Sequence, residues 1–502
     1  MSQSYHDGSC TLSPLDQLMP RIYTTVFLVY ETDQYESAIG KLNEGLAKTT
    51  SLLPFLRGYV HKSPDGCDPR NQLLLSWSSQ DPPPAMVETP APESLPSFET
   101  LKLSEVPLSI FQNGLSPVPV VIDYQIPGAR APALVIGATR LEGGLILCLQ
   151  AHHVVMDGAG MGMFLKLWGD CTRDEPNHSD DKAPFDPGEV YDRVAWLRDA
   201  SGYSAQTKPK ATLDELLLRH PEYSLRSRSS ALSSSSVSVP TNVASHPAKC
   251  AANIFAFSSA KLQEAKQAMS SSVPAKFLTV NNVLGAALWL CVTRIRLGRV
   301  RRDGLATVTG STTSKLGFAV NARSRLGPAV SNRSYLGNAT MLKVVEFPAT
   351  KLKSIAGNAM ASPAAVADLS LMAPVISAIG AATAAVTATH VGEVVAFADH
   401  LADVEDVGPG WNSFHGLDLT YTSWANLGMY DCDFGASLGG KPRFVRCPYM
   451  PYIDGMVLAL PRRGLVDTLD RKALERIEVA VMLNERDMRA MEEDEMLRSW
   501  SA

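Results

Sequence analysis

The sequence predicts an α/β protein with two domains, and three features of the chain lead to this prediction. Its 502 residues are too many for one ordinary hydrophobic core and fit two domains comfortably. Strand-like runs and helical segments are mixed in both halves of the chain, which is typical of sheets covered by helices. Between the halves lies a serine-rich stretch, "RSRSSALSSSSVSVPTNVASHP" (226–247), with too few large apolar side chains to form a core.

These features divide the chain into three parts. We expect an N-terminal domain over residues 1–205, a crossover or linker over 206–250 and a C-terminal domain over 251–502. No internal repeat is evident in either domain.

The N-terminal domain is predicted from two apolar runs and a helix. "IYTTVFLVY" (22–30) and "LILCLQAHHVV" (145–155) are rich in apolar and β-branched residues and predict strands, whereas residues 36–50 predict a helix. The segment "DGAGMGMFLKLW" (157–168) begins with glycines and continues with a helical apolar face. It predicts a strand–turn–helix in which a backbone conformation open to glycine turns the chain sharply.

The C-terminal domain begins with a strand and a helix in "CAANIFAFSSAKLQEAKQAM" (250–269). A second helix is expected in "TVNNVLGAALWLCVTRIR" (279–296), after an asparagine-rich start that can cap it. The segment 441–463 predicts two strands around a proline-rich turn, and 473–497 predicts a β-branched run followed by a charged amphipathic helix.

The charge balance argues against nucleic acid as a main partner. The formal net charge is −5, whereas phosphate binding requires a concentrated basic surface. The one basic cluster, "RIRLGRVRR" (294–302), is interpreted as the solvated end of a helix.

Cysteine spacing and hydropathy bear on the compartment. The eight cysteines show no CxxC pair, which favours reduced thiols inside a cell over a disulfide framework or a zinc site. The N-terminal segment has neither the basic start nor the apolar core of a signal peptide, so none is expected. Residues 369–392 contain no Asp, Glu, Lys or Arg, but their small side chains favour a buried helix over a membrane span. We therefore expect a cytoplasmic protein without a membrane segment.

The stretch "AHHVVMDGAG" (151–160) is the strongest candidate for chemistry. Because side chains alternate along a strand, His152 and His153 are expected to face opposite sides of the sheet. A histidine held at the rigid end of a strand, facing a cleft, meets the requirement for a general base. A histidine near an aspartate is also common as a hydrogen-bonded core pair, so this stretch alone leaves both interpretations open.

The same stretch resembles the HxxxDG signature of the BAHD acyltransferases, with His153 and Asp157 in the two signature positions. Further segments resemble motifs of that family in the expected order, so the similarity extends over nearly the whole chain. The sequence is similar to the fungal branch, of the trichothecene 3-O-acetyltransferase type. These segments are "LSPLDQLMPRIY" (12–23), "SLLPFLRGYV" (51–60), "VNNVLGAALW" (280–289), "VNARSRLGPAVSNRSYLGNA" (320–339) and "TSWANLGMYDCDFG" (422–435).

The resemblance implies a two-domain chloramphenicol-acetyltransferase-like fold, each domain a mixed β-sheet flanked by helices, with a channel between the domains. One segment departs from the family pattern. After Asp433, Phe434 and Gly435, the Trp-Gly of the family's DFGWG is replaced by "ASLGG". Because this motif is structural in the family, Asp433 and Gly435 are expected to shape a loop away from the reacting atoms.

The resemblance further implies transfer of an acyl group, with acetyl as the default, from acyl-CoA to a hydroxyl or, as a lesser alternative, an amine. His153 would take the proton from the acceptor, and no acyl-enzyme would form. Trp424 and Thr422 match the family residues beside the developing oxyanion. Asp157 is expected to point away from the substrate and pair with Arg323.

For the coenzyme, the resemblance implies a channel reached by Lys266, Thr279, Asn281 and the glycines from Gly158 onwards. These glycines lack the GxGxxG spacing of a dinucleotide fingerprint. We expect acyl-CoA as co-substrate, no permanently bound cofactor, no metal, a small-molecule alcohol as acceptor, and a monomer.

Three other functions compete with this prediction. "GASLG" (435–439) formally matches GxSxG, which would make Ser437 the nucleophile of a serine hydrolase if a core strand preceded it and a helix followed. Condensation domains of peptide synthetases share the HHxxxDG pattern and would use a carrier-protein thioester as donor. A two-lobed protein could also bind or cyclise a natural product without transferring an acyl group.

Overall fold

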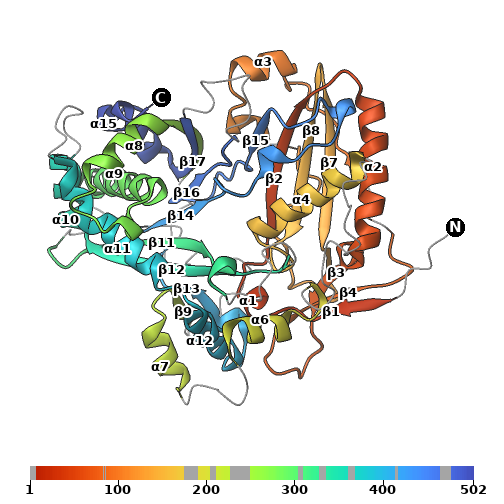
Figure 1. Ribbon diagram of the computed structural model, residues 1–502, viewed down its shortest axis with the longest axis horizontal. Helices are drawn as coiled ribbons and strands as arrows, with labels where there is room; N and C mark the ends of the chain where they lie inside the picture. The colour runs from red at the N-terminus through yellow and green to blue at the C-terminus, as the bar shows by residue number, and fades with distance from the viewer. Residues whose placement is uncertain are drawn as a thin grey trace.

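The computed structural model describes most of the chain, and its two large sheets lie on opposite sides of the molecule (Figure 1). Each sheet mixes parallel and antiparallel neighbours and is flanked by helices, as the sequence predicts. The described residues are 7–82, 84, 86–112, 114–173, 190–203, 211–226, 249–302, 309–326, 335–359, 368–412, 416–463 and 476–501.

The first sheet has five strands and is built mainly from the N-terminal domain. Its central strands are almost entirely buried, because apolar side chains on both faces are covered. Leu147 and Leu149 of this sheet pack in one cluster with Leu42, Phe164 and Leu165 from two helices. In order the strands are β15 (Phe444–Arg446), β2 (Tyr23–Glu31), β8 (Gly144–His152), β7 (Leu134–Leu141) and β5 (Met86–Glu88), and the helices are α2 (Tyr35–Leu52) and α4 (Gly158–Arg173).

Shorter elements complete this lobe. A four-stranded sheet consists of β1 (Gly8–Cys10), β4 (Leu73–Trp77), β3 (Tyr59–Lys62) and β6 (Arg130–Pro132). The short helices are α1 (Pro14–Gln17), α3 (Phe98–Leu103) and α6 (Arg193–Ser201).

The second sheet has six strands and packs against the longest helix of the described chain. Helix α9 (Val280–Arg302) is buried on nearly all sides, because Val283 through Leu290 offer apolar or small side chains to every direction. The strands are β10 (Cys250–Ser258), β17 (Arg476–Asn484), β16 (Met456–Ala459), β14 (Leu419–Ser423), β11 (Thr313–Asn321) and β12 (Thr340–Pro348). The remaining helices are α8 (Ser259–Ala268), α10 (Ala349–Ala359), α11 (Ala373–Ala384), α12 (Ala388–Asp399), α14 (Glu485–Glu492) and α15 (Glu495–Ser499).

The C-terminal part of the chain adds a strand to the first sheet, and one apolar cluster contains residues of both large sheets. The predicted domain boundaries do not account for this arrangement. Strand β15, predicted within the C-terminal domain, pairs with β2 of the first sheet. The buried Arg446 on β15 forms a bidentate ion pair with Glu478 on β17, with nitrogen–oxygen distances of 2.9 and 3.1 Å. A third apolar cluster includes Phe27 and Met482, one from each large sheet. Residues after 428 therefore belong partly to the first lobe.

Part of the predicted crossover is folded into the core. Residues 211–226 form α7 (Leu213–Arg219) and β9 (Tyr223–Leu225), and β9 pairs with β13 (Val407–Pro409). The side chains of Leu216 and Tyr223 are buried in the larger core cluster. Residues 206–210 and 227–248 of the predicted crossover lie outside the described residues.

The apolar stretch 369–392 forms parts of two helices instead of one. Helices α11 and α12 lie on either side of a 72° bend, and Thr387 caps the second by accepting a hydrogen bond from the His390 backbone. Val375 and Val394 are fully buried in the core. Across the described ranges, no single helix is long and apolar enough to cross a membrane, and this bent pair meets such a test only by length and composition.

The basic end of α9 is more buried than the sequence suggests. Arg296 is fully enclosed and donates to Asp454 at 2.5 Å and to the Asp418 carbonyl at 2.6 Å. Arg299 pairs with the buried Asp487 at 2.8 Å. The interpretation of 294–302 as a solvated helix end is therefore wrong for these arginines, which fix α9 to neighbouring segments.

Candidate active site

The strand–turn–helix predicted around the two histidines is formed by β8 and α4. His152 ends β8 and is fully buried. Its Nδ1 accepts a hydrogen bond from the Val154 backbone at 3.3 Å, so Nε2 carries the proton and donates to the Tyr124 hydroxyl at 2.7 Å. Burial lowers the pKa of His152 to about 3. This histidine is a hydrogen-bonded core residue with no access to a substrate.

His153 lies directly after the strand and is partly exposed. Its backbone N–H donates to the Ile22 carbonyl at 2.9 Å, and its carbonyl accepts from the Asn338 side chain at 2.8 Å. Its Nδ1 is buried and makes no hydrogen bond within the described part of the chain, which leaves Nε2 as the nitrogen available outward. Burial lowers the pKa of His153, although its own backbone and Asp157 oppose this shift. The imidazole is therefore neutral at pH 7 and can accept a proton.

The Asp157 carboxylate turns away from this exposed edge and is fully paired. Arg323 donates to both of its oxygens at 2.9 Å, in the planar two-bond arrangement that favours arginine. The Gly160 and Ala339 backbones and the Thr340 hydroxyl donate the remaining bonds at 2.9, 3.0 and 2.9 Å. Arg323 and these hydrogen bonds keep the pKa of Asp157 below its ordinary value despite burial. The structure thus brings together the pair that the resemblance implies.

A second buried carboxylate supports the same corner, and sequence reasoning missed it. Asp16 accepts two hydrogen bonds from Asn338, both at 2.8 Å, and Asn338 in turn holds the His153 carbonyl. Arg193 contacts Asp16 at 3.4 Å and donates to the Val155 carbonyl at 2.7 Å. The available signal was the "SPLD" capping box, in which Ser13 and Asp16 cap α1 reciprocally.

The glycines of α4 serve close packing, and the predicted glycine-dependent turn is wrong. No glycine between residues 158 and 162 has a positive φ. A Cβ on Gly160 or Gly162 would instead overlap a carbonyl oxygen, that of Leu336 or of Leu427. A Cβ on Gly169 would lie 2.6 Å from the Asp433 carbonyl oxygen. Small residues here let α4 approach the backbone of C-terminal segments, and the Gly160 N–H donates to Asp157 instead of facing a channel.

Trp424 lies against the start of α4. A Cβ placed on Gly158 would be 3.6 Å from the indole Nε1 and 2.8 Å from Leu427. The Trp424 backbone donates to the Ala459 carbonyl at 2.8 Å, which extends the pairing of β14 with β16. Thr422, on β14, is partly buried. The late segment and the HxxxDG corner are therefore neighbours in space.

The altered DFG segment is a loop packed on α4. Phe434 is buried edge-to-face on Trp168 with ring centres 4.8 Å apart. Asp433 accepts from the Gly435 backbone at 2.8 Å, and Gly435 adopts a φ of +89° that strongly favours glycine. Ser437 lies in a short 3-10 turn, Ala436–Leu438, with neither a preceding core strand nor a following α-helix. The serine-hydrolase alternative therefore lacks its required elbow.

The predicted coenzyme residues lie at the start of α9 and on α8. Thr279 is exposed and accepts a hydrogen bond from the Asn282 backbone at 3.1 Å. Asn281 accepts from the Tyr421 hydroxyl at 2.8 Å, and both line a cavity of about 220 Å³ together with Ser423. Thr422 points to the opposite face of β14 from Tyr421 and Ser423. Lys266 is partly exposed on α8, and within the described residues it makes no hydrogen bond to Trp424 or His153.

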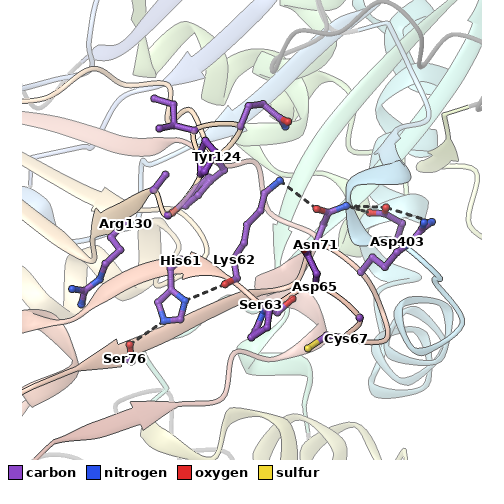
Figure 2. Close-up of a pocket in the computed structure, with 18 residues that line it drawn as sticks. His61, Lys62, Ser63, Asp65, Cys67, Asn71, Ser76, Tyr124, Arg130 and Asp403 are labelled. Carbon is purple, nitrogen blue, oxygen red and sulfur yellow. Dashed lines mark hydrogen bonds and ion pairs between the residues drawn. The ribbon is translucent and has the colours of Figure 1, made fainter.

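A larger cavity, of about 910 Å³, lies beside β3 and β4 (Figure 2). Tyr124 lines it, and its hydroxyl reaches the buried His152. Lys62, another lining residue, pairs with Glu405 at 3.1 Å. Neither His153 nor Trp424 lines this cavity, so it is separate from the corner described above.

The whole chain matches a known family. A model of the Transferase family matches residues 2–497, and the chain therefore belongs to this family, the BAHD acyltransferases. It is 31% identical to trichothecene 8-O-acetyltransferase of Fusarium sporotrichioides over 516 aligned residues, which cover 100% of this chain and 99% of that relative. It is 23% identical to trichothecene 3-O-acetyltransferase TRI101 of the same fungus, over 88% of this chain and 87% of the relative.

Solved structures show the same fold. Apo TRI101 of F. graminearum superposes with a TM-score of 0.73 at 19% identity, over 99% of both chains. TRI101 of F. sporotrichioides complexed with coenzyme A and T-2 superposes with a TM-score of 0.73 at 20% identity, over 98% of both chains. The predicted two-domain fold is thereby confirmed.

Proposed function

We propose that this protein transfers an acyl group, by default acetyl, from acyl-CoA to a hydroxyl of a small-molecule natural product. Family membership over residues 2–497 and similarity to a fungal O-acetyltransferase over the full length support this reaction. The observation that carries the proposal is His153, a neutral and partly exposed imidazole fixed through both its backbone N–H and its carbonyl.

In this mechanism the His153 Nε2 accepts the hydroxyl proton as the acceptor oxygen forms a bond to the thioester carbonyl carbon. The tetrahedral intermediate then breaks its carbon–sulfur bond, and the imidazolium returns the proton to the leaving thiolate of coenzyme A. The products are an ester and free coenzyme A, and no acyl-enzyme forms. A base positioned in this way contributes roughly 10²–10⁴-fold to the rate.

The remaining site residues are assigned supporting parts. Asp157 and Arg323 position the corner that presents His153, and they do not touch the reacting atoms. Trp424 is assigned as an indole N–H donor to the oxyanion, and its position beside the start of α4 supports this assignment. Thr422 is proposed to provide a second donor. Asp433 and Gly435 shape the loop that packs on α4.

For the coenzyme we propose Lys266, Thr279, Asn281 and Gly158. The Asn281 oxygen is engaged by Tyr421, which leaves its amide N–H groups for a ligand, and the Thr279 hydroxyl can still donate. Lys266 would supply positive charge for a phosphate. We further propose that the protein acts as a cytoplasmic monomer without a membrane partner.

The test is a panel of acyl-CoA donors offered with fungal-type polycyclic alcohols, read by release of free thiol. We expect turnover with acetyl-CoA, loss of turnover in His153→Ala, and a measurable rate in His152→Ala. Turnover with an acyl-carrier thioester but not with acetyl-CoA would instead support the condensation-type reaction. Binding of an alcohol without thiol release, unaffected by His153→Ala, would support a binding role and contradict the proposal.

A further inference from the structure

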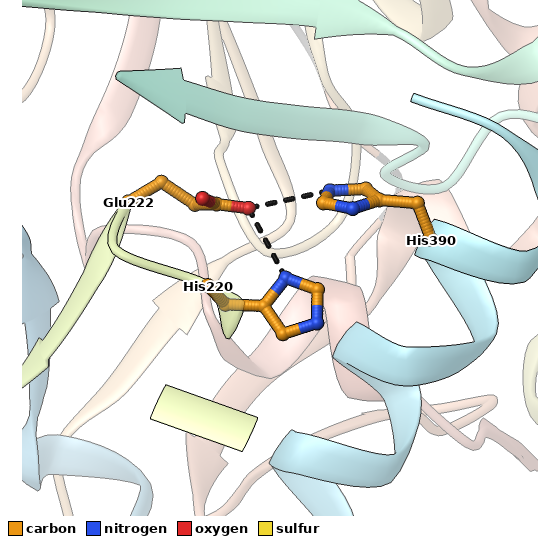
Figure 3. A group of neighbouring side chains, drawn as sticks. All are labelled: His220, Glu222 and His390. Carbon is orange, nitrogen blue, oxygen red and sulfur yellow. Dashed lines mark hydrogen bonds and ion pairs between the residues drawn. The ribbon is translucent and has the colours of Figure 1, made fainter. Parts of the chain in front are cut away.

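A group of metal-ligating side chains lies in the C-terminal lobe, apart from the proposed active site (Figure 3). His220 and Glu222 lie between α7 and β9, and His390 lies in the first turn of α12. The Glu222 Oε1 atom is 3.2 Å from the His220 Nδ1 atom and 3.2 Å from the His390 Nε2 atom. One ligand atom from each residue lies within 4.8 Å of the others. Figure 3 shows both imidazoles turned toward the carboxylate.

Hydrogen bonds among the described residues do not satisfy this group. Glu222 is fully enclosed, and its second oxygen, Oε2, has no hydrogen-bond partner there. The His390 side chain is only 10% exposed, and its Nε2 contacts Glu222 without forming a hydrogen bond. Buried polar atoms without partners are rare and costly in folded proteins. Both unpartnered atoms belong to this one group of three side chains, which indicates a missing ligand.

We propose that His220, Glu222 and His390 bind a divalent transition-metal ion, of which Zn²⁺ is the natural representative. Two imidazole nitrogens and a carboxylate form a common zinc ligand set, with water completing the tetrahedron. Ligands about 2.0–2.1 Å from zinc lie about 3.3 Å from one another in that geometry, close to the two 3.2 Å separations observed here.

The surroundings also contain the outer partner that such a site requires. A metal-binding histidine ordinarily donates its other ring N–H to a carboxylate, which fixes its tautomer. The second nitrogen of His220, Nε2, lies 3.4 Å from an oxygen of Glu393 without forming a hydrogen bond here, so Glu393 is the residue that would take this part once the metal orients the ring. Glu393 is located one turn after His390 on α12, so a single helix would supply one ligand and the outer partner of another.

Lys343 opposes the binding of a cation here. Its ammonium lies 3.1 Å from the Glu222 Oε1 atom and is largely buried. Because a carboxylate oxygen has two lone pairs, Oε1 can bind the metal and still accept from Lys343, so both cations can share Glu222 at the cost of mutual repulsion. Replacing Lys343 with methionine therefore has a definite expected effect, which is tighter metal binding.

The proposed ion would tie three segments of the C-terminal lobe together. The segment 220–222 belongs to the predicted crossover, and α12 and β12 pack beside it. None of the three ligands contacts His153, Asp157 or Trp424. The metal is thus a structural clip, distinct from the acyl-transfer chemistry.

The experiment uses the full-length protein, stripped with a chelator and then titrated calorimetrically with Zn²⁺ alone. We expect one site per chain and a melting temperature that rises with zinc and falls again with chelator. Glu393→Gln should weaken binding roughly 10–100-fold, whereas His390→Ala and Glu222→Gln should weaken it more. His400→Ala, directly after the same helix, is the matched control and should bind as the wild type.

A Co²⁺ titration separates this site from the eight cysteines of the chain. Cobalt bound by imidazole and carboxylate shows visible bands without a thiolate charge-transfer band. The wild-type spectrum therefore identifies the ligands even if a ligand variant fails to fold. A thiolate band, the absence of stoichiometric binding, or unchanged affinity in folded His390→Ala would overturn the proposal. Acetyl transfer measured in the same samples should not depend on zinc, so failure of this site leaves the proposed acyl transfer standing.

Discussion

Arg323 donates two parallel hydrogen bonds of 2.9 Å to the Asp157 carboxylate, although the two residues are 166 positions apart in the chain. Both side chains are almost completely buried. The pair joins the turn before α4 to the segment after β11, so it fixes the corner that carries His153 against the second lobe. Its geometry is that of a positioning device, because neither charged group faces the exposed edge of His153.

Asp157→Ala should therefore lose activity because the folded protein is less stable, and not because a reacting group is missing. Removing one partner of a buried ion pair leaves an uncompensated charge and costs about 3–5 kcal/mol. We expect a clearly lower melting temperature in differential scanning calorimetry, together with lost activity. In Asp157→Ala/Arg323→Ala the second change should add little. A variant that melts like the wild type but lacks activity would show that Asp157 acts in the chemistry.

His152 should make the protein less stable in mild acid. Its pKa is about 3 in the folded state and about 6.5 in an unfolded chain. Between these pH values His152 binds a proton in the unfolded state but not in the folded state. The free energy of unfolding is therefore unaffected by this residue above pH 6.5 and decreases as the pH falls below that value. The slope is at most about 1.4 kcal/mol per pH unit.

The measurement compares melting temperatures at pH 7 and pH 5 for the wild type and for His152→Gln. The loss on acidification should be smaller in the variant. An equal loss in both proteins would mean that other groups cause the acid sensitivity.

The sequence predicts those parts of the site that are local along the chain. The end of a strand at His152, opposite facing of the two histidines and a following helix all follow from patterns over a few residues. The contact of Asp157 with Arg323 came from the family resemblance, since no spacing pattern links positions so far apart.

Features that depend on long-range contacts were missed or misjudged. Asp16 meets Asn338 across 322 positions, and only the folded chain makes them neighbours. The glycine pattern of α4 predicts a special φ angle, whereas the structure requires these glycines because carbonyl groups of distant segments, such as that of Leu336, approach the helix closely. The sequence predicts a solvated Arg296 because it does not show that Asp454, 158 positions later, lies beside this arginine in the core.

Gly160→Ala should destabilise the protein because the new methyl group would overlap the Leu336 carbonyl oxygen. Overpacking of this kind costs about 1–3 kcal/mol. The matched control is Gly40→Ala on α2, where a Cβ meets nothing within 4 Å and the change should stabilise the helix by about 0.5–1 kcal/mol. Opposite shifts in melting temperature are expected. A rise in both would contradict the close-packing role.

Trp424→Phe tests the proposed oxyanion donor while retaining most of the aromatic packing. Loss of one preorganised donor typically lowers kcat about 10²–10³-fold, and KM for acetyl-CoA should change little. Trp411→Phe removes another indole donor, one that bonds to the Thr420 hydroxyl at 2.9 Å, and should affect stability more than kcat. Equal kcat losses in the two variants would remove Trp424 from the chemistry.

The pH profile of kcat/KM should report the protonation of His153. Burial lowers the pKa of this imidazole below its ordinary value of about 6.5, so the acidic limb of the profile should lie below pH 6.5. The Asp157 charge opposes that shift, and Asp157→Asn should therefore move the limb to still lower pH in whatever fraction remains folded. A merely structural carboxylate would lower the amount of active enzyme without moving the limb. An acidic limb above pH 6.5 in the wild type would contradict His153 as the neutral base.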